Sequence, residues 1–259
     1  MKKSYEIKHE KLTKEDVEKI KAEIICSDNG QIDSLYINGV VLVIDENEIF
    51  LMNSEVRMHC DFKDRLPRLN EHNLNRELLV RAVGYKSGQR TDKITIADAT
   101  AGLGEDSLIL AAAGFNVIMY EKDPVVAALL RDSLRRAALD SQLNEMTARM
   151  HLIEGSSIDA FTRNAYNEKS AVYESNMSNN AFIRPDIIYL DPMFPERSKS
   201  GLVKKKFQLL HFLERPCDNE EELLNAAINA EPEKIIIKRP LKGPVLAGIK
   251  PAYSIKGKH

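Results

Sequence analysis

From residue 93 onward, short apolar segments with the character of strands alternate with longer segments that have the spacing of helices. This alternation constrains the fold more than any other feature. Strands that alternate with helices form a parallel sheet, and the helices cover both of its faces. The pattern predicts an α/β fold with strands at residues 94–97, 116–120, 151–153, 186–190 and 235–238. Helices are expected at residues 105–113, 125–139 and 218–230, the last opened by a capping box of Asp218 and Glu221.

The first part of the chain has a different pattern of predicted helices and strands. A short helix at 14–24 and two strands at 34–44 and 48–53 predict a small α+β unit. A polar, basic stretch follows, with a helix at 74–83 that ends at Gly84. Further on, residues 163–183 are polar and predict an exposed loop. We therefore expect two domains, a small N-terminal α+β subdomain over residues 1–65 and a larger α/β domain over residues 66–259.

Composition argues against several classes of protein. The chain has 259 residues, of which 43% are hydrophobic, enough for a packed core. Its net charge of −2 argues against a generic binder of polyanions, so contact with nucleic acid needs a local basic patch. The three cysteines are far apart and form no disulfide or metal pattern. No signal peptide or membrane span is predicted. We expect a cytoplasmic protein without a metal and without membrane association.

A glycine turn follows the first strand of the alternation. Beyond the carboxyl end of that strand, where open α/β sheets bind ligands, stand Asp98, Gly102 and Gly104. Ser107 occupies the place of the third glycine of a dinucleotide fingerprint. Glu105 and Asp106 would repel a pyrophosphate at the start of the following helix. A cationic or neutral cofactor is therefore favoured, and S-adenosylmethionine carries a sulfonium and an amino group.

The next two strands also end in polar side chains. Glu121 lies seventeen residues after Gly104, close to the spacing of about 20 residues at which an acid grips ribose hydroxyls. Ser156 and Ser157 follow the third strand and could bond the edge of an adenine. Each feature has a simpler interpretation, a solvated acid for Glu121 and a common turn for the serines. Together at one edge of the sheet they favour a nucleotide-like cofactor.

Asp191, Pro192 and Phe194 come directly after the apolar strand 186–190. An acid and backbone carbonyls can accept hydrogen bonds from the amino group of a flat ring, and an aromatic side chain can stack on that ring. Asp191 could instead cap a helix or bind a metal, but no second acid or histidine stands nearby. Cys217 raises the alternative of carbon-5 methylation of a pyrimidine, although it is better explained as a loop cysteine. The motif predicts methyl transfer to the exocyclic amine of a nucleobase.

Basic residues follow this motif. They are Arg197, Lys199, Lys204, Lys205 and Lys206, with Lys238 and Arg239 at the end of the fifth strand. A charge run is usually a solvated surface, but this one adjoins the expected target site. A role in contacting RNA phosphates is the alternative.

The motifs taken together resemble the bacterial ribosomal RNA small subunit methyltransferase J family. The resemblance rests on residues 98–106, 121–130, 156–157, 189–195, 199–200, 202–205 and 238–240. It implies a Rossmann-like class I methyltransferase that uses S-adenosylmethionine to methylate the 2-amino group of a guanine in 16S rRNA. The implied partner is 16S rRNA or the small ribosomal subunit. The cofactor residues that it implies are Glu105, Asp106, Glu121, Lys122, Ser156, Ser157 and Asp191.

The chain departs from the family pattern at several positions. Glu105 and Lys122 stand where arginine is usual in the family, and Arg76 with Glu77 is what remains of an arginine-containing segment that the family uses to grip RNA. Relatives also continue into a last strand beyond residue 259. Two other hypotheses stay open: an amine methyltransferase acting on DNA adenine, another RNA or a protein, and a non-catalytic RNA-binding or assembly factor with the same fold.

Overall fold

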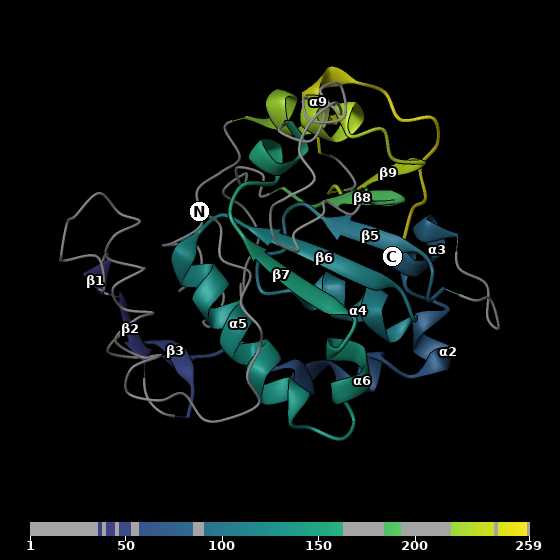
Figure 1. Ribbon diagram of the computed structural model, residues 1–259. Coiled ribbons are helices and arrows are strands. Elements are labelled where there is room, and N and C mark those ends of the chain that lie inside the picture. Colours follow the sequence, from purple (N-terminus) through teal and green to yellow (C-terminus); the bar gives the residue numbers. More distant parts are fainter. Residues whose placement is uncertain are drawn as a thin grey trace, which may run out of the picture.

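The computed structural model describes residues 36–37, 40–44, 47–52, 57–84, 91–162, 184–192, 219–240 and 243–257. Two sheets lie within these ranges. The larger one is central and the smaller one, near the N-terminus, lies beside a long helix (Figure 1). The expected helix at 14–24, the expected loop at 163–183 and the residues Phe194, Lys199, Lys204 and Lys205 lie outside the described residues.

The central sheet has five strands, all parallel, in the order β7-β6-β5-β8-β9. The predicted parallel sheet is therefore confirmed, with strand ends that move by one residue or remain in place. The strands are β5 (Thr95–Asp98), β6 (Asn116–Glu121), β7 (Met150–Glu154), β8 (Ile187–Leu190) and β9 (Lys234–Ile237). The chain runs from β5 outward to β7 and then returns to β8 on the other side of β5. The carboxyl ends of β5 and β8 thus form the switch point at which such sheets bind ligands.

Helices cover both faces of this sheet (Figure 1). On one face, α4 (Glu105–Ala112) and α5 (Pro124–Ala138) pack in a core that includes Met119 and Tyr189. On the other face, α9 (Glu220–Asn229) packs in a core that includes Ile118 and Ile188. Neighbouring strand residues enter opposite cores because side chains alternate along a strand. The sheet is buried on both sides, which explains its nearly continuous apolar strands.

Local chemistry sets the start of α5. The Asp123 side chain accepts hydrogen bonds from the backbone N–H groups of Val125 and Val126, and Pro124 occupies the first helical position. Both features are typical of helix N-termini. In α9 the expected capping box is wrong, because the helix begins at Glu220 and its N-cap is Asn219, whose side chain makes no cap bond. Asp218 lies outside the described residues.

The helix predicted at 74–83 ends at Gly84 as expected, but the structure divides it into two short helices, α2 (Glu71–Leu74) and α3 (Leu78–Val83). The break falls at Glu77, whose backbone is extended. Its carboxylate accepts two hydrogen bonds of 2.9 Å from Arg68. This bidentate pair ties the break to the preceding 3₁₀ helix, η2 (Phe62–Arg68), and a sequence pattern does not reveal it.

The smaller sheet is antiparallel, with the order β1-β2-β3-β4. Its strands are β1 (Tyr36–Ile37), β2 (Val40–Ile44), β3 (Ile49–Met52) and β4 (Arg57–Met58), so the first predicted strand is divided and a fourth strand is added. The backbone N–H of Ile49 donates to Asp132 of α5 at 3.1 Å. Residue 65, the expected domain boundary, lies inside η2, and Phe62 belongs to the core of the large sheet. The division into two domains therefore stays a prediction.

Candidate active site

Asp98 ends β5 and is the most buried acid of the site, with 1% of its surface exposed. Its carboxylate accepts a hydrogen bond of 2.6 Å from the Ser107 hydroxyl and one of 3.2 Å from the backbone N–H of Thr100. Burial raises the pKa of Asp98 to about 7, although both hydrogen bonds work in the opposite direction. Asp98 thus joins the end of β5 to the first turn of α4.

The glycine turn is tied to the end of β6. The backbone N–H of Gly102 donates to Glu121 Oε2 at 2.8 Å, and the N–H of Asp123 donates to Oε1 at 2.8 Å. Burial raises the pKa of Glu121 to about 7. Gly102 has a φ of +54°, and a Cβ added there would meet no atom within 4 Å. The turn therefore presents bare backbone to open space, next to an acid.

Asp191 follows β8 and lies beside the same turn. Its backbone N–H donates to Thr100 Oγ1 at 2.7 Å, which joins the ends of β5 and β8. Lys238, the residue after β9, donates from Nζ to Asp191 Oδ2 at 2.7 Å and to Asp106 Oδ2 at 2.6 Å. The Tyr189 hydroxyl donates to the same Asp106 oxygen at 2.6 Å. Burial raises the pKa of Asp191, and Lys238 offsets part of that rise.

The other predicted cofactor residues differ in their hydrogen-bond partners and in their exposure. The Ser157 hydroxyl donates to the carbonyl of Ala99 at 2.8 Å, so the end of β7 also meets the end of β5. Ser156 Oγ accepts from the N–H of Asp159 at 3.3 Å and caps the turn that follows β7. Glu105 forms an ion pair with Arg65 of η2. Lys122 is exposed.

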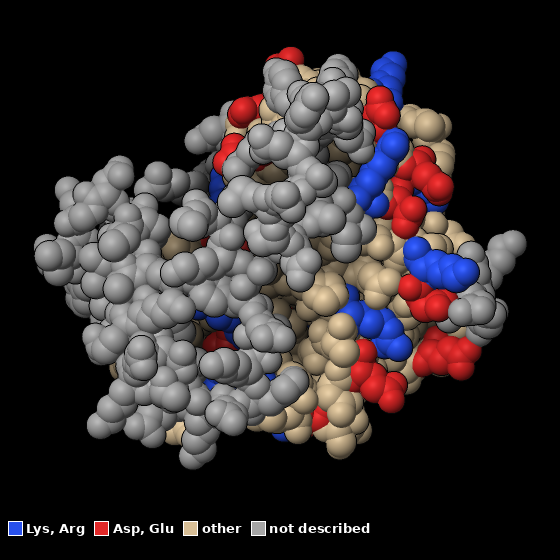
Figure 2. Space-filling model, in the orientation of Figure 1, with Lys and Arg blue, Asp and Glu red and all other residues tan. Residues whose placement is uncertain are grey.

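Three of the predicted RNA-binding residues are described, namely Arg76, Lys238 and Arg239. Arg76 is exposed between α2 and α3, 3.5 Å from the ring of His72. Arg239 donates from Nε to the carbonyl of Pro244 at 2.7 Å and lies 3.6 Å from Glu220. In the described part of the face shown in Figure 2, basic side chains lie beside acidic ones rather than in a continuous patch.

Three residues of this site were not predicted: Thr100, Ser107 and Tyr189. Thr100 and Ser107 stand within or next to the glycine turn, and Tyr189 lies two residues before Asp191. Position near a strand end was the available signal for all three. Their partners became visible only when the strands were placed side by side.

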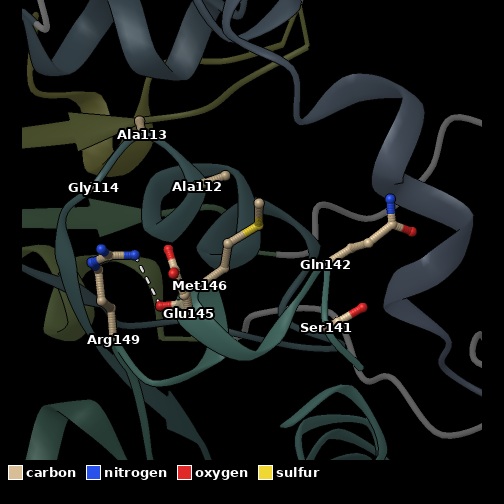
Figure 3. Close-up of a pocket in the computed structure, with 8 residues that line it drawn as sticks. All are labelled: Ala112, Ala113, Gly114, Ser141, Gln142, Glu145, Met146 and Arg149. Atoms are coloured by element: carbon tan, nitrogen blue, oxygen red, sulfur yellow. Dashed lines mark hydrogen bonds between the residues drawn. The ribbon is translucent and has the colours of Figure 1, made fainter. Parts of the chain in front are cut away.

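A pocket of about 430 Å³ lies elsewhere, between the end of α4 and the short helix α6 (Asn144–Thr147) (Figure 3). Its lining residues are Ala112, Ala113, Gly114, Ser141, Gln142, Glu145, Met146 and Arg149. Gly114 and Arg149 precede β6 and β7, so the pocket is at the amino ends of the strands. Asp98 and Asp191 lie at the opposite edge of the sheet, the rim formed by the carboxyl ends of the strands. Ligands of parallel sheets bind at that edge.

A family model described as "Putative SAM-dependent methyltransferase" matches residues 36–259. The chain belongs to this methyltransferase family. The crystal structure of a SAM-dependent methyltransferase from Neisseria gonorrhoeae is similar to this methyltransferase, with a TM-score of 0.60 and 30% sequence identity. The similarity covers 83% of this chain and 77% of that one. The Rossmann-like α/β fold that we predicted is thereby confirmed.

Curated relatives of the methyltransferase carry the name ribosomal RNA small subunit methyltransferase J. The protein of that name from Thioalkalivibrio sulfidiphilus is 42% identical over 185 residues, or 71% of this chain and 66% of the relative. The one from Pseudomonas fluorescens is 38% identical over 182 residues, or 70% of this chain and 63% of the relative. The matched part of this chain thus spans somewhat less than two thirds of these relatives.

The cofactor of this family is S-adenosylmethionine, and the residues of the rim fit it. Open space beside Gly102 lets a ligand approach the backbone. Glu121 can accept ribose hydroxyls as well, because a carboxylate has about four lone-pair sites and two backbone N–H groups use two of them. The acidic groups Asp98, Asp106 and Asp191 suit the positive sulfonium and amino groups. Among the described residues, none form a cluster of three or more potential metal ligands, and no described helix is long and apolar enough to cross a membrane.

Proposed function

We propose that this protein transfers a methyl group from S-adenosylmethionine to the exocyclic N2 amine of a guanine in 16S rRNA. One observation carries the proposal: Asp191 follows β8 directly beside the glycine turn of β5, and its backbone N–H donates to Thr100 next to that turn. A donor held at the turn and an amine held by Asp191 would therefore share one rim. Such adjacency is what a direct transfer between the two needs.

The name of the curated relatives supports the choice of substrate. Proteins called ribosomal RNA small subunit methyltransferase J are 38% to 42% identical to this chain over 182 to 185 residues. We extend their substrate class to this chain, with 16S rRNA or the small ribosomal subunit as partner. This substrate implies a cytoplasmic protein.

The residues of the chain would hold the cofactor and orient the guanine amine. S-adenosylmethionine supplies an electrophilic methyl group on a sulfonium. Gly102, Glu121 and Asp98 would hold it, with Ser157 supporting the turn. The guanine amine is a weak nucleophile because its lone pair is delocalised into the ring. Hydrogen bonds from its N–H groups to Asp191 and to the carbonyl of Pro192 would aim that lone pair.

Orientation can supply much of the rate enhancement. Holding two reactants in line can lower a barrier by about 7–11 kcal/mol in favourable cases. After transfer, the methylated nitrogen must lose a proton, and Asp191, whose pKa is raised by burial, is placed to accept it. Phe194 would stack on the base. Contacts with RNA phosphates are proposed for Arg76, Lys199, Lys204, Lys205 and Arg239.

The test is methyl transfer from labelled S-adenosylmethionine to small ribosomal subunits, or to 16S rRNA, that lack the mark. Mass spectrometry of the nucleosides should then identify N2-methylguanosine. A methylated adenine, or guanine methylated at another atom, would show that the specificity is wrong. No transfer together with no S-adenosylmethionine binding would favour the non-catalytic alternative.

Asp191→Ala should lower kcat by about 100-fold or more, since it removes the acceptor that orients the amine. Calorimetry should show little change in affinity for S-adenosylmethionine. A collapse of that affinity would instead assign Asp191 to the cofactor site.

A further inference from the structure

Lys238 lies at the rim because of strand register, not because of sequence proximity. Ile237 of β9 pairs with Leu190 of β8, and the backbone N–H of Lys238 donates to the Leu190 carbonyl at 2.9 Å. The residue after β9 is thus held beside Asp191, the residue after β8. The two are 47 positions apart in the chain.

The Lys238 ammonium bridges two carboxylates from different elements. It donates to Asp191 Oδ2 and Asp106 Oδ2, while the Tyr189 hydroxyl also donates to Asp106 Oδ2. Tyr189 itself is 1% exposed and packed in the core. A buried anchor therefore fixes Asp106, Asp106 fixes the ammonium, and the ammonium fixes one oxygen of Asp191. Hydrogen-bonded networks of this kind restrict side-chain geometry.

The charges around Asp191 make the Lys238 ammonium important. Asp191 is faced by Asp106 from α4, by Lys238 after β9 and by Tyr189 on its own strand. The negative charges of Asp98 and Asp191 also repel each other. Burial and Asp106 both raise the pKa of Asp191, and Lys238 lowers it. A neutral carboxylic acid would accept hydrogen bonds more weakly than a carboxylate does. Without the ammonium, the pKa of Asp191 would rise further, which favours the neutral acid.

We infer that Lys238 is a positioning residue, whose ammonium keeps the Asp191 carboxylate charged and oriented so that its second oxygen can accept a hydrogen bond from the substrate amine. This role rests on the proposed function and replaces the expectation that Lys238 contacts an RNA phosphate. Two of the three N–H donors of the ammonium are already used by the carboxylates of Asp106 and Asp191.

The decisive experiment compares Lys238→Met, which keeps the length of the side chain without its charge, with Lys238→Arg, which keeps the charge. Lys250→Met is the matched control, because Lys250 is exposed and lies outside the strands of the central sheet. Circular dichroism verifies that each variant folds. The first readout is an NMR titration of carboxyl-labelled aspartate, with Asp191 assigned by the signal lost in Asp191→Asn. It needs neither cofactor nor RNA.

The Asp191 titration midpoint should rise by about one to three pH units in Lys238→Met, because an opposite charge at this distance lowers a carboxyl pKa by about that much. It should stay within about one pH unit of the wild type in Lys238→Arg and unchanged in Lys250→Met. An unchanged midpoint in Lys238→Met would overturn the inference. This readout stands even if the protein methylates some other substrate, or none.

The second readout is the pH profile of methyl transfer. Lys238→Met should move the acid limb of kcat to higher pH, lower kcat at pH 7 by about tenfold or more, and leave the KM for RNA within about twofold. Lys238→Arg should recover most of the rate. If Lys238→Met instead raises the KM for RNA, reduces its salt dependence and leaves the pH profile in place, Lys238 is a phosphate contact and the inference fails.

Discussion

At the scale of single residues, Gly102 and Gly104 differ although they share one turn. Both have a left-handed backbone, with φ of +54° and +73°. A Cβ at Gly102 would enter open space, whereas one at Gly104 would lie 2.7 Å from Leu130 Cδ1. Gly102 therefore keeps room for a ligand, and Gly104 lets α4 approach α5.

Alanine substitutions should separate these two roles. Gly104→Ala should lower the free energy of unfolding by about 2–4 kcal/mol, from backbone strain together with overpacking. Gly102→Ala should lower it by only about 1–2 kcal/mol, but should weaken S-adenosylmethionine binding at least tenfold because the methyl group fills the space beside the turn. Urea denaturation and calorimetry measure the two effects. Equal stability losses, or unaltered cofactor affinity in Gly102→Ala, would contradict this assignment.

Glu121 predicts a pH dependence of cofactor affinity. Its pKa is raised from 4.5 to about 7 by burial, so it is partly protonated at neutral pH. Accepting ribose hydroxyls and facing a cationic ligand both favour the carboxylate. S-adenosylmethionine affinity should therefore increase from pH 6 to pH 8, with release of protons on binding at pH 7. Calorimetry in buffers of different ionisation enthalpy measures this release.

Glu121→Gln should bind more weakly at pH 8 and show a smaller change between pH 6 and pH 8. Asp98, whose pKa is also near 7, leaves some pH dependence in this variant. An affinity that is constant from pH 6 to pH 8 in the wild type would be inconsistent with an ionised Glu121 in the bound state.

At the scale of elements, α5 joins the small sheet to the large one. The Asp132 side chain has no exposed surface and accepts hydrogen bonds from Arg135 at 2.7 Å, from Arg136 at 2.8 Å and from the backbone N–H of Ile49 at 3.1 Å. Arg135 also donates to the carbonyl of Asn47, and Arg136 to that of Cys60. A single carboxylate thus organises two arginines that reach the N-terminal segment.

Asp132→Ala should lower the free energy of unfolding by about 3–5 kcal/mol, since it removes the counter-charge of the buried Arg135 guanidinium and leaves Arg136 only its longer pair of 3.7 Å with Asp61. Asp140→Ala is the matched control, because Asp140 pairs with the exposed Lys63 and should have a much smaller effect. Urea denaturation compares the two variants. Limited proteolysis should also cut the segment around β3 faster in Asp132→Ala. Similar stabilities for the two variants would show that the buried network does not hold the small sheet.

At the scale of the whole molecule, the site exists because five parallel strands end at one edge. Its residues come from positions 98 to 238, and no two of the strands that carry them are joined by a short turn. Placing β5 between β6 and β8 brings Glu121 to one side of the glycine turn and Asp191 to the other. A cofactor and a substrate could thus approach the same turn from neighbouring strand ends.

Much of this arrangement was predictable. Apolar runs and helical spacing determined the five strands and the helices after residue 93, because burial on both faces of a parallel sheet demands nearly continuous apolar strands. Acids and glycines directly after those strands predicted that Asp98, Gly102, Glu121 and Asp191 lie together at one edge of the sheet, where such folds bind ligands. These inferences need only local sequence and the geometry of one fold class.

The sequence by itself thus determined the strands, their parallel arrangement and the acids at their ends. Only the tertiary structure decided which charges meet: Lys238 with Asp191, Arg65 with Glu105, and Arg68 with Glu77 at the break in the predicted helix. The physical reason is that hydrophobic periodicity is encoded locally, along one element. An ion pair depends instead on the register of distant elements, and a charged residue in a sequence does not indicate its partner.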